Sequence, residues 1–158
     1  FERVRFPEGR IWEDIWLVTY FCFEPVRYVR NPEVKYYYRQ TEGSIIRSDA
    51  TPRKAREAIY ILENSLKLIN AKIRDKALKR RLIKRNMEKA VFHYLNLALS
   101  PTIEIRKIYA ALYLRRMHYS VFQCLISNQI PLKNKISYAL CRMRLNKLVI
   151  LAKNTLKI

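Results

Sequence analysis

Glycine is nearly missing from this chain, and most of its proline lies near one end. Of 158 residues only Gly9 and Gly43 are glycine, and beyond Pro52 the only prolines are Pro101 and Pro131. Because these residue types most often interrupt helices, their scarcity predicts that the chain is almost wholly helical after residue 50. We therefore expect an all-α fold.

Acidic side chains are also scarce. The chain carries 32 Lys and Arg against 13 Asp and Glu, which gives a formal charge of +19, and no acid follows Glu104. This excess is larger than solubility requires, and ion pairs within the C-terminal third cannot balance it. The partner is therefore expected to be anionic: RNA, an acidic protein face or an anionic membrane.

Patterns typical of metal, cofactor or catalytic sites are missing. The three cysteines, Cys22, Cys124 and Cys141, form no CxxC pair, and there are only two histidines. No GxGxxG, no phosphate-binding glycine loop and no nucleophile with a neighbouring base occurs. We expect no disulfide framework, no metal site, no cofactor and no catalytic residue.

Long apolar runs are missing as well. The most apolar stretch, residues 11–23, is about half the length that a membrane-spanning helix needs, and it contains Glu13 and Asp14. We therefore expect no membrane span.

What is present suggests three regions. Residues 1–50 contain several prolines and many aromatics, and we expect an irregular, aromatic-rich N-terminal extension. Within it, Trp12, Trp16, Tyr20 and Phe23 have helical spacing and are expected to dock on a partner protein or on the domain itself.

Thr51 and Pro52 form a helix start, and no stop follows until Ser100 and Pro101. This predicts one helix of about 48 residues, roughly 70 Å long, part of which must project. We expect residues 51–89 to form a long basic helical arm and residues 90–158 a helical globular domain. Further helices are expected from Ile103, after Ser120, after Pro131 and from Asn146.

The pattern of apolar and basic residues changes along the arm. An apolar stripe runs from Ala55 to Ile69 at helical spacing, and it dissolves between Lys72 and Lys89. At 100° per residue, Arg74, Arg81 and Arg85 lie opposite Lys72, Lys76 and Lys79, so cations surround the helix. A solvated connecting helix is one interpretation, but like charges four residues apart repel, and RNA on several sides would relieve that repulsion.

The C-terminal half resembles a known family. Tyr119-Ser120-x-Phe122, Ile130-x-Leu132-x-x-Lys135 and Leu148-Val149-x-x-Ala152-Lys153 follow one another as in large-subunit ribosomal protein L-twenty. The basic stretches at residues 84–87 and 53–56 resemble parts of that family's arm. The resemblance covers about residues 52–158, but residues 100–118 insert an extra helix. It implies a structural protein whose arm threads through ribosomal RNA, in a divergent mitochondrial form.

These arguments give a set of candidate RNA contacts. They are Arg53, Lys54, Arg56, Lys72, Arg74, Lys76, Lys79, Arg80, Arg81, Lys84, Arg85, Asn86 and Lys89. Such contacts bind phosphate and carry no base code, so the RNA would be recognised by shape. Tyr36, Tyr37 and Tyr38 either stack on unpaired bases or belong to an alternating strand with one or two rings packed inward.

Two other functions remain open. Leu112, Tyr113, Arg115 and Arg116 are close to the Leu-Tyr-Arg signature of mitochondrial accessory subunits that bind acyl carrier protein, although Leu114 interrupts the triplet. A membrane-surface helix would need separate polar and apolar faces, which the basic segment lacks. We expect a protein of the mitochondrial matrix that contacts large-subunit RNA and neighbouring ribosomal proteins and is not a homo-oligomer.

Overall fold

The computed structural model describes residues 5–21, 23, 27, 29–33, 35–37, 39 and 49–156. Within these ranges all regular secondary structure is helical and there is no strand, which confirms the predicted all-α class. The helices are α1 (Glu13–Phe21), α2 (Pro52–Lys72), α3 (Lys76–Ala98), η1 (Ile105–Tyr109), α4 (Ala110–Arg116), α5 (Val121–Ile126), α6 (Leu132–Arg142) and α7 (Asn146–Leu156).

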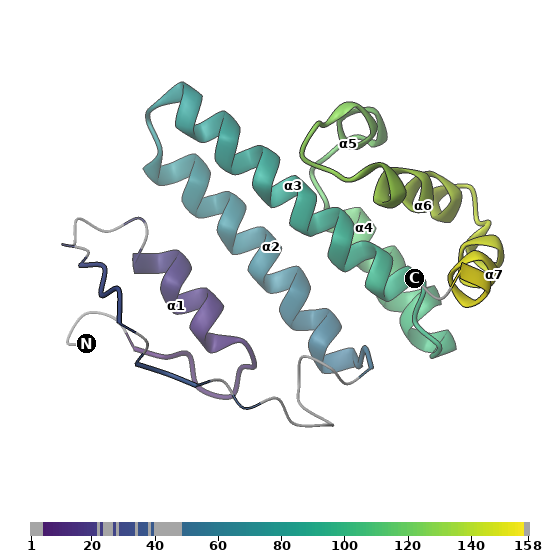
Figure 1. Cartoon of the computed structure of the whole chain (residues 1–158), viewed down its shortest axis with the longest axis horizontal. Coiled ribbons are helices and arrows are strands. Elements are labelled where there is room, and N and C mark those ends of the chain that lie inside the picture. Colours follow the sequence, from purple (N-terminus) through teal and green to yellow (C-terminus); the bar gives the residue numbers. More distant parts are fainter. Residues whose placement is uncertain are drawn as a thin grey trace.

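The prediction of one uninterrupted helix from residue 51 to residue 99 is wrong. The chain turns back at residues 73–75, and α2 and α3 lie side by side as an antiparallel hairpin (Figure 1). The helix start itself is confirmed, since the Thr51 hydroxyl accepts a hydrogen bond from the Lys54 amide at 3.2 Å and Pro52 is the first helical residue.

The break has a local and a tertiary cause. Ile73 adopts an extended conformation after α2, and the Asp75 carboxylate caps α3 by accepting a hydrogen bond from the Leu78 amide at 2.6 Å. The buried apolar residues of α2 from Ala55 to Leu66 and the buried residues of α3 join one hydrophobic cluster. A straight helix would leave the stripe from Ala55 to Leu66 in water, so burying it favours the fold-back.

That cluster is the core of the molecule and extends from Ala55 to Val149. It therefore draws on both sides of the boundary that we expect at residue 89. The rings of Tyr94 on α3 and Tyr138 on α6 meet edge to face, with centroids 5.5 Å apart, and Tyr113 on α4 is fully buried. Small residues such as Ala90 let the helices approach closely.

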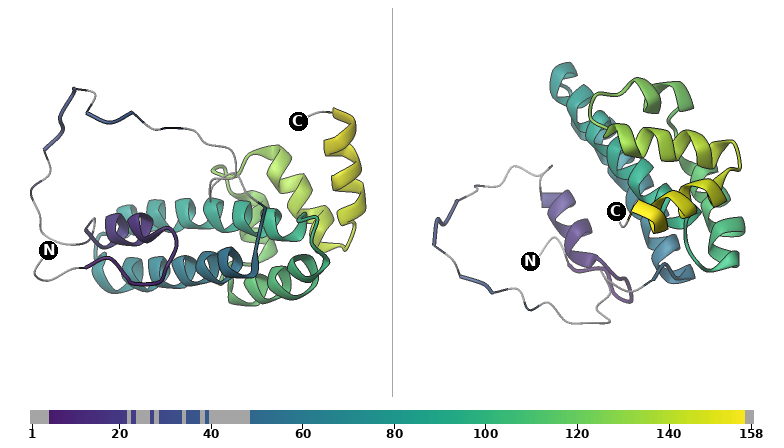
Figure 2. Two further views of the ribbon diagram at one scale, coloured as in Figure 1. Left: turned by 90° about the horizontal axis from the view of Figure 1, so that it is seen from below. Right: turned by 45° about the vertical axis from the view of Figure 1, so that its right-hand side comes forward.

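The C-terminal helices begin where the sequence predicts. Ser120 forms a capping box with Gln123 at the start of α5, α6 follows Pro131, and α7 begins at Asn146. The helix expected from Ile103 is present but contains a π turn, η1, which continues directly into α4. Figure 2 shows that α7 lies at the opposite end of the molecule from the hairpin turn.

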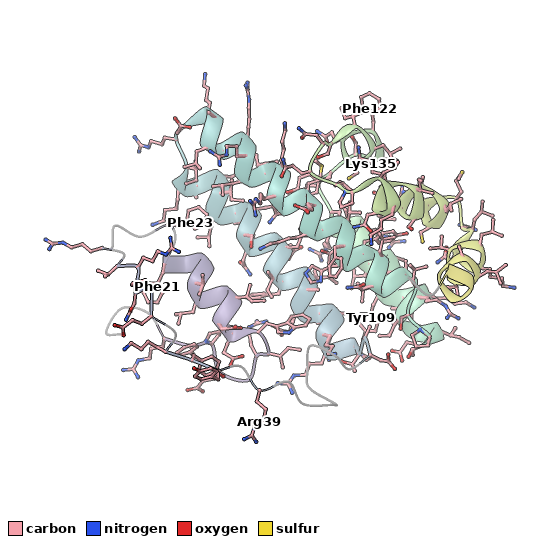
Figure 3. All side chains as sticks on the ribbon, viewed as in Figure 1. Phe21, Phe23, Arg39, Tyr109, Phe122 and Lys135 are labelled. Atoms are coloured by element: carbon pink, nitrogen blue, oxygen red, sulfur yellow. The ribbon has the colours of Figure 1, made fainter. Side chains whose placement is uncertain are left out.

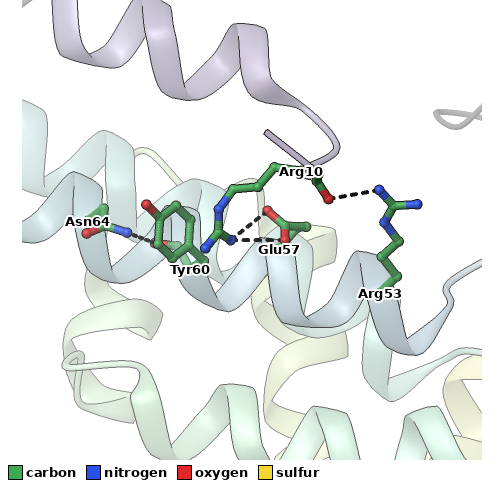
Figure 4. A network of polar contacts seen from close by, with 6 residues as sticks. Arg10, Arg53, Glu57, Tyr60 and Asn64 are labelled. Carbon is green, nitrogen blue, oxygen red and sulfur yellow. Dashed lines mark hydrogen bonds and ion pairs between the residues drawn. The ribbon is translucent and has the colours of Figure 1, made fainter. Parts of the chain in front are cut away.

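Part of the N-terminal extension docks on α2. The Arg10 guanidinium donates to both carboxylate oxygens of Glu57, at 3.0 and 3.2 Å, and lies 3.6 Å above the Tyr60 ring (Figure 4). Arg53 donates to the carbonyl of Gly9 at 3.0 Å, where glycine permits a φ of 70°. These contacts explain why Glu57 is buried although it is charged.

Aromatic contacts strengthen this docking. The ring of Trp12 lies 6.3 Å from that of His93 on α3, and Trp12 packs against the core. The helical spacing predicted for this stretch corresponds to α1, while the side chains of Trp16 and Tyr20 lie outside the described residues. The expected docking on the domain is therefore observed for Trp12.

An arginine occupies a position that favours glycine at the end of α6. Arg144 has a φ of 63°, its amide donates to Cys141 at 3.1 Å, and the next amide, of Leu145, donates to Leu140 at 2.9 Å. This pattern is a Schellman cap, whose left-handed residue is usually glycine because a Cβ is disfavoured there.

We expect Arg144→Gly to raise the free energy of unfolding by about 1 kcal/mol, since it relieves this strain. Urea denaturation of both proteins measures the difference. Arg142→Gly removes the same charge from the last turn of α6, where glycine weakens a helix, and should lower stability. Equal shifts in both variants would mean that charge, not backbone strain, is responsible.

Candidate nucleic-acid interface

The end of the α2–α3 hairpin extends beyond the core. Ile69 is the last buried residue of α2 and Met87 is the first of α3, so residues 70–86 contain no buried side chain. We call residues 72–85 the hairpin tip. The projection expected of a straight arm is thus made by a two-helix tip, about 15 Å of α3 in length from Lys76 to Arg85.

The hairpin tip carries eight cations and one acid. The cations are Lys72, Arg74, Lys76, Lys79, Arg80, Arg81, Lys84 and Arg85, and all but Lys79 are exposed. In Figure 3 side chains that end in nitrogen stand out from this part of the hairpin in several directions. The fold therefore gathers most of the predicted RNA contacts into one surface.

Acids do not neutralise this surface. The one acid of the tip, Asp75, caps α3, and the nearest acids along α2 are engaged elsewhere: Glu63 pairs with Arg116 and Glu57 with Arg10, both at 3.0 Å. Among the described residues no ion pair involves Arg74, Lys76, Arg80, Arg81, Lys84 or Arg85. Their charges repel one another, which lowers the stability of the bare tip and favours an anionic ligand.

The cations also lie on more than one side of α3. Arg81 and Arg85 share one face because they are four residues apart, and this face is opposite the buried residues Met87 and Tyr94. Lys76 and Arg80 lie on the side that becomes the core face further along the helix. A ligand that neutralises both sets has to surround the tip, not cover one flank.

A second group of predicted contacts lies elsewhere. Arg53, Lys54 and Arg56 occupy the start of α2, about 30 Å from the turn at 1.5 Å per residue. Each donates a hydrogen bond within the chain: Arg53 to the carbonyl of Gly9, Lys54 to that of Asp49 and Arg56 to the hydroxyl of Tyr109. These cations help to hold the fold, and the structure does not bring them to the tip.

Lys54 illustrates the difference between the two groups. Burial lowers the pKa of its ammonium group, and the nearby carboxylate of Asp49 partly opposes that effect. Because its ammonium group already donates to the carbonyl of Asp49, Lys54 is less available to phosphate than the cations of the hairpin tip.

Asn86 and Lys89 lie at the base of the tip. The Asn86 side-chain oxygen accepts a hydrogen bond of 2.8 Å from the Tyr119 hydroxyl, so it joins α3 to the segment before α5. Lys89 is exposed, and its charge adds to the effect of burial in lowering the pKa of His93. His93 is thus a partly buried histidine packed on Trp12, which favours its neutral form.

The structure describes two of the three residues of the tyrosine run. Tyr36 and Tyr37 are 76% and 87% exposed, and Tyr38 lies outside the described residues. The inward packing of one or two rings is not seen for Tyr36 and Tyr37. Exposed rings next to Lys35 and Arg39 suit stacking on bases, and that role stays a prediction.

One residue near the tip escaped the sequence prediction. Lys67 on α2 is exposed and lies off the buried stripe, one to two turns before Lys72. Its signal was present in the helical spacing, but only the fold-back places it beside a basic stretch of α3.

No family model matches this chain, no curated protein does, and no solved structure does. The resemblance to the L-twenty family therefore rests on the residues quoted above.

The described part of the chain lacks both metal-ligand clusters and membrane-spanning helices. It contains no group of three His, Cys, Asp or Glu side chains that could hold a metal ion. None of its helices is both long enough and apolar enough to cross a bilayer. Cys124 and Cys141 are thiols buried in the core, and Cys22 lies outside the described residues.

Proposed function

We propose that this protein is a structural RNA-binding component of a large ribosomal subunit, of the L-twenty type and mitochondrial. The observation that carries the proposal is the hairpin tip, with eight cations against one acid, projecting beyond the core. RNA is the polyanion best suited to surround such a tip, because folded RNA presents phosphates on several sides.

The proposed mechanism is charge neutralisation. Cations of the tip bind phosphates of separate RNA segments, which lets those segments approach each other during assembly. Phosphate contacts carry no base sequence, so the shape of the RNA would select the site. The function requires one copy per subunit, neighbouring ribosomal proteins as further partners, and no catalytic residue.

The alternative remains an accessory subunit that binds acyl carrier protein. Its candidate stretch lies on α4, where Tyr113 is fully buried and Arg116 is paired with Glu63. Tyr113 is therefore committed to the core, and Arg116, although exposed, is already paired. Leu112 and Arg115 are exposed and form no ion pair within the described residues. The alternative also leaves the cations on the two sides of the tip without a partner.

A sedimentation experiment separates the two functions. A tagged full-length chain from gently lysed organelles, run through a low-salt gradient, should migrate with large-subunit RNA, and ribonuclease treatment should abolish that migration. The RNA is identified by hybridisation in each fraction. Migration with a membrane complex that ribonuclease does not affect would contradict the ribosomal proposal and support the accessory-subunit function.

A further inference from the structure

Helix α6 has two apolar faces, and the core uses only one of them. Tyr138 and Cys141 point inward, and Tyr138 packs edge to face on Tyr94 of α3. Leu132, Ile136, Ala139 and Met143 share the opposite side. Of these, Leu132, Ile136 and Met143 are 72%, 53% and 59% exposed. A solvent face is normally polar, so this stripe needs an explanation.

The spacing of the stripe is that of a helix–helix seam. Its members are separated by four, three and four residues, which is the alternation of a and d positions in a coiled coil. A narrow stripe of this kind fits one helix packed alongside α6. We call Leu132, Ile136, Ala139 and Met143 the α6 seam.

Charge selects the occupant of the seam. Lys133, Lys135 and Arg142 flank it, and the chain has no acid after Glu104. A second copy placed on the seam would set cations against cations, which disfavours a dimer. RNA gains little from aliphatic side chains, because its affinity comes from phosphate contacts and stacking. The complementary surface is a helix with an apolar seam and acidic flanks.

We propose that the α6 seam binds one amphipathic helix of another protein, which brings leucine-like residues to the seam and Asp or Glu to its flanks. Helix α6, which carries the seam, lies toward the end of the molecule away from the hairpin turn, as Figures 1 and 2 show. The inference uses none of the residues of the hairpin tip, so it does not depend on the ribosomal proposal.

The probe is a synthetic helical peptide with Leu at a and d and Glu at e and g. We expect it to bind the full-length chain, measured by fluorescence anisotropy of the labelled peptide. Ile136→Gln should weaken that binding by about tenfold or more, the loss typical of a central apolar contact. Ile108→Gln is the matched control: Ile108 on η1 is 58% exposed but lies outside the seam, so its substitution should change nothing.

Two further peptides test seam and charge separately. A peptide with the same composition in scrambled order keeps the acids but loses the seam, and one with Lys at e and g keeps the seam but reverses the flanks. Both should bind at least about tenfold more weakly than the probe. Equal binding of the scrambled peptide would overturn the proposal, because it would show nonspecific attraction to a basic protein.

Two measurements complete the test. Leu132→Gln provides a second variant in case Ile136→Gln alters the fold, and circular dichroism shows whether each variant is folded. If either folded variant binds the probe as tightly as the unsubstituted chain does, the proposal is overturned. Sedimentation equilibrium without peptide checks for a dimer, and a dimer that Ile136→Gln dissociates would assign the seam to a second copy instead. A variant in which cations of the hairpin tip are replaced by glutamate should still bind the probe peptide. Failure of the RNA proposal can therefore be distinguished from failure of the seam proposal.

Discussion

Replacing four cations of the hairpin tip with glutamate should abolish binding to large-subunit RNA and block incorporation into the subunit. The four are Arg80, Arg81, Lys84 and Arg85, which are exposed and form no ion pair within the described part of the chain. Affinity at low salt should fall at least about a hundredfold, and the slope of log K against log salt should decrease by about 3, because phosphate contacts release counterions.

The same substitutions should leave the fold intact. Exposed side chains without an ion pair contribute little, so each substitution should change the free energy of unfolding by no more than about 0.5 kcal/mol, and weaker repulsion between cations favours the folded tip. Filter binding over a salt series and urea denaturation provide the two measurements. Normal incorporation of this variant into the subunit would count heavily against the proposed function.

A charge-matched control distinguishes the tip from overall charge. Reversal of four exposed cations elsewhere, Lys107, Arg115, Lys133 and Lys147, changes the net charge by the same amount. We expect this variant to retain most RNA affinity, because these residues lie on η1, α4, α6 and α7. If both variants lost affinity equally, net charge alone would govern binding, and the tip would have no special role.

Removal of the Tyr113 side chain should have the largest effect on stability. Tyr113 is fully buried where α4 joins the core, so Tyr113→Ala would leave a cavity and lower the free energy of unfolding by about 3–5 kcal/mol. Small domains are stable by about 5–15 kcal/mol, so a loss of this size is a large fraction of the total. Urea denaturation followed by circular dichroism measures the loss.

Tyr113→Phe separates the ring from the hydroxyl. The hydroxyl is buried and has no hydrogen-bond partner in the described part of the chain, and burial raises the pKa of Tyr113 far above its ordinary value. Because an unsatisfied buried hydroxyl costs free energy, we expect Tyr113→Phe to be neutral or to stabilise by about 1 kcal/mol. A clear destabilisation would mean that the hydroxyl has a partner.

The starts of the helices in the C-terminal half could be predicted because local chemistry decides them. Ser120 satisfies free amides at the start of α5, and Pro131 precedes α6 where its missing amide costs nothing. The start of α2 at Thr51 and Pro52 has the same origin. These signals act within a few residues and do not depend on what the helix packs against.

The hairpin turn could not be predicted in the same way. Residues 73–75 contain neither glycine nor proline. Asp75 caps α3, but from the sequence alone it cannot be distinguished from an acidic residue in the middle of a helix. In the sequence, the apolar stripe of α2 and the apolar residues from Ala90 to Ala98 are separate patterns. Their burial against each other decides the turn, because hydrophobic gain outweighs the loss of a few helical hydrogen bonds.

Composition accounts for the chemistry of the candidate site but not for its geometry. Its chemistry follows from composition: a run of cations with one acid repels itself and attracts phosphate whatever the fold. Which cations act together does not follow from composition. The fold-back gathers Lys72 to Arg85 at one projecting tip, while Arg53, Lys54 and Arg56 hydrogen-bond within the chain about 30 Å away.

Residue types and their local spacing make this protein helical, strongly basic and free of acids after Glu104. The packing of the helices, in contrast, is what makes α2 and α3 a hairpin, lets the tip project and leaves a second apolar face of α6 exposed. The reason is that burial depends on which helix faces become neighbours, and such contacts join residues far apart in the chain.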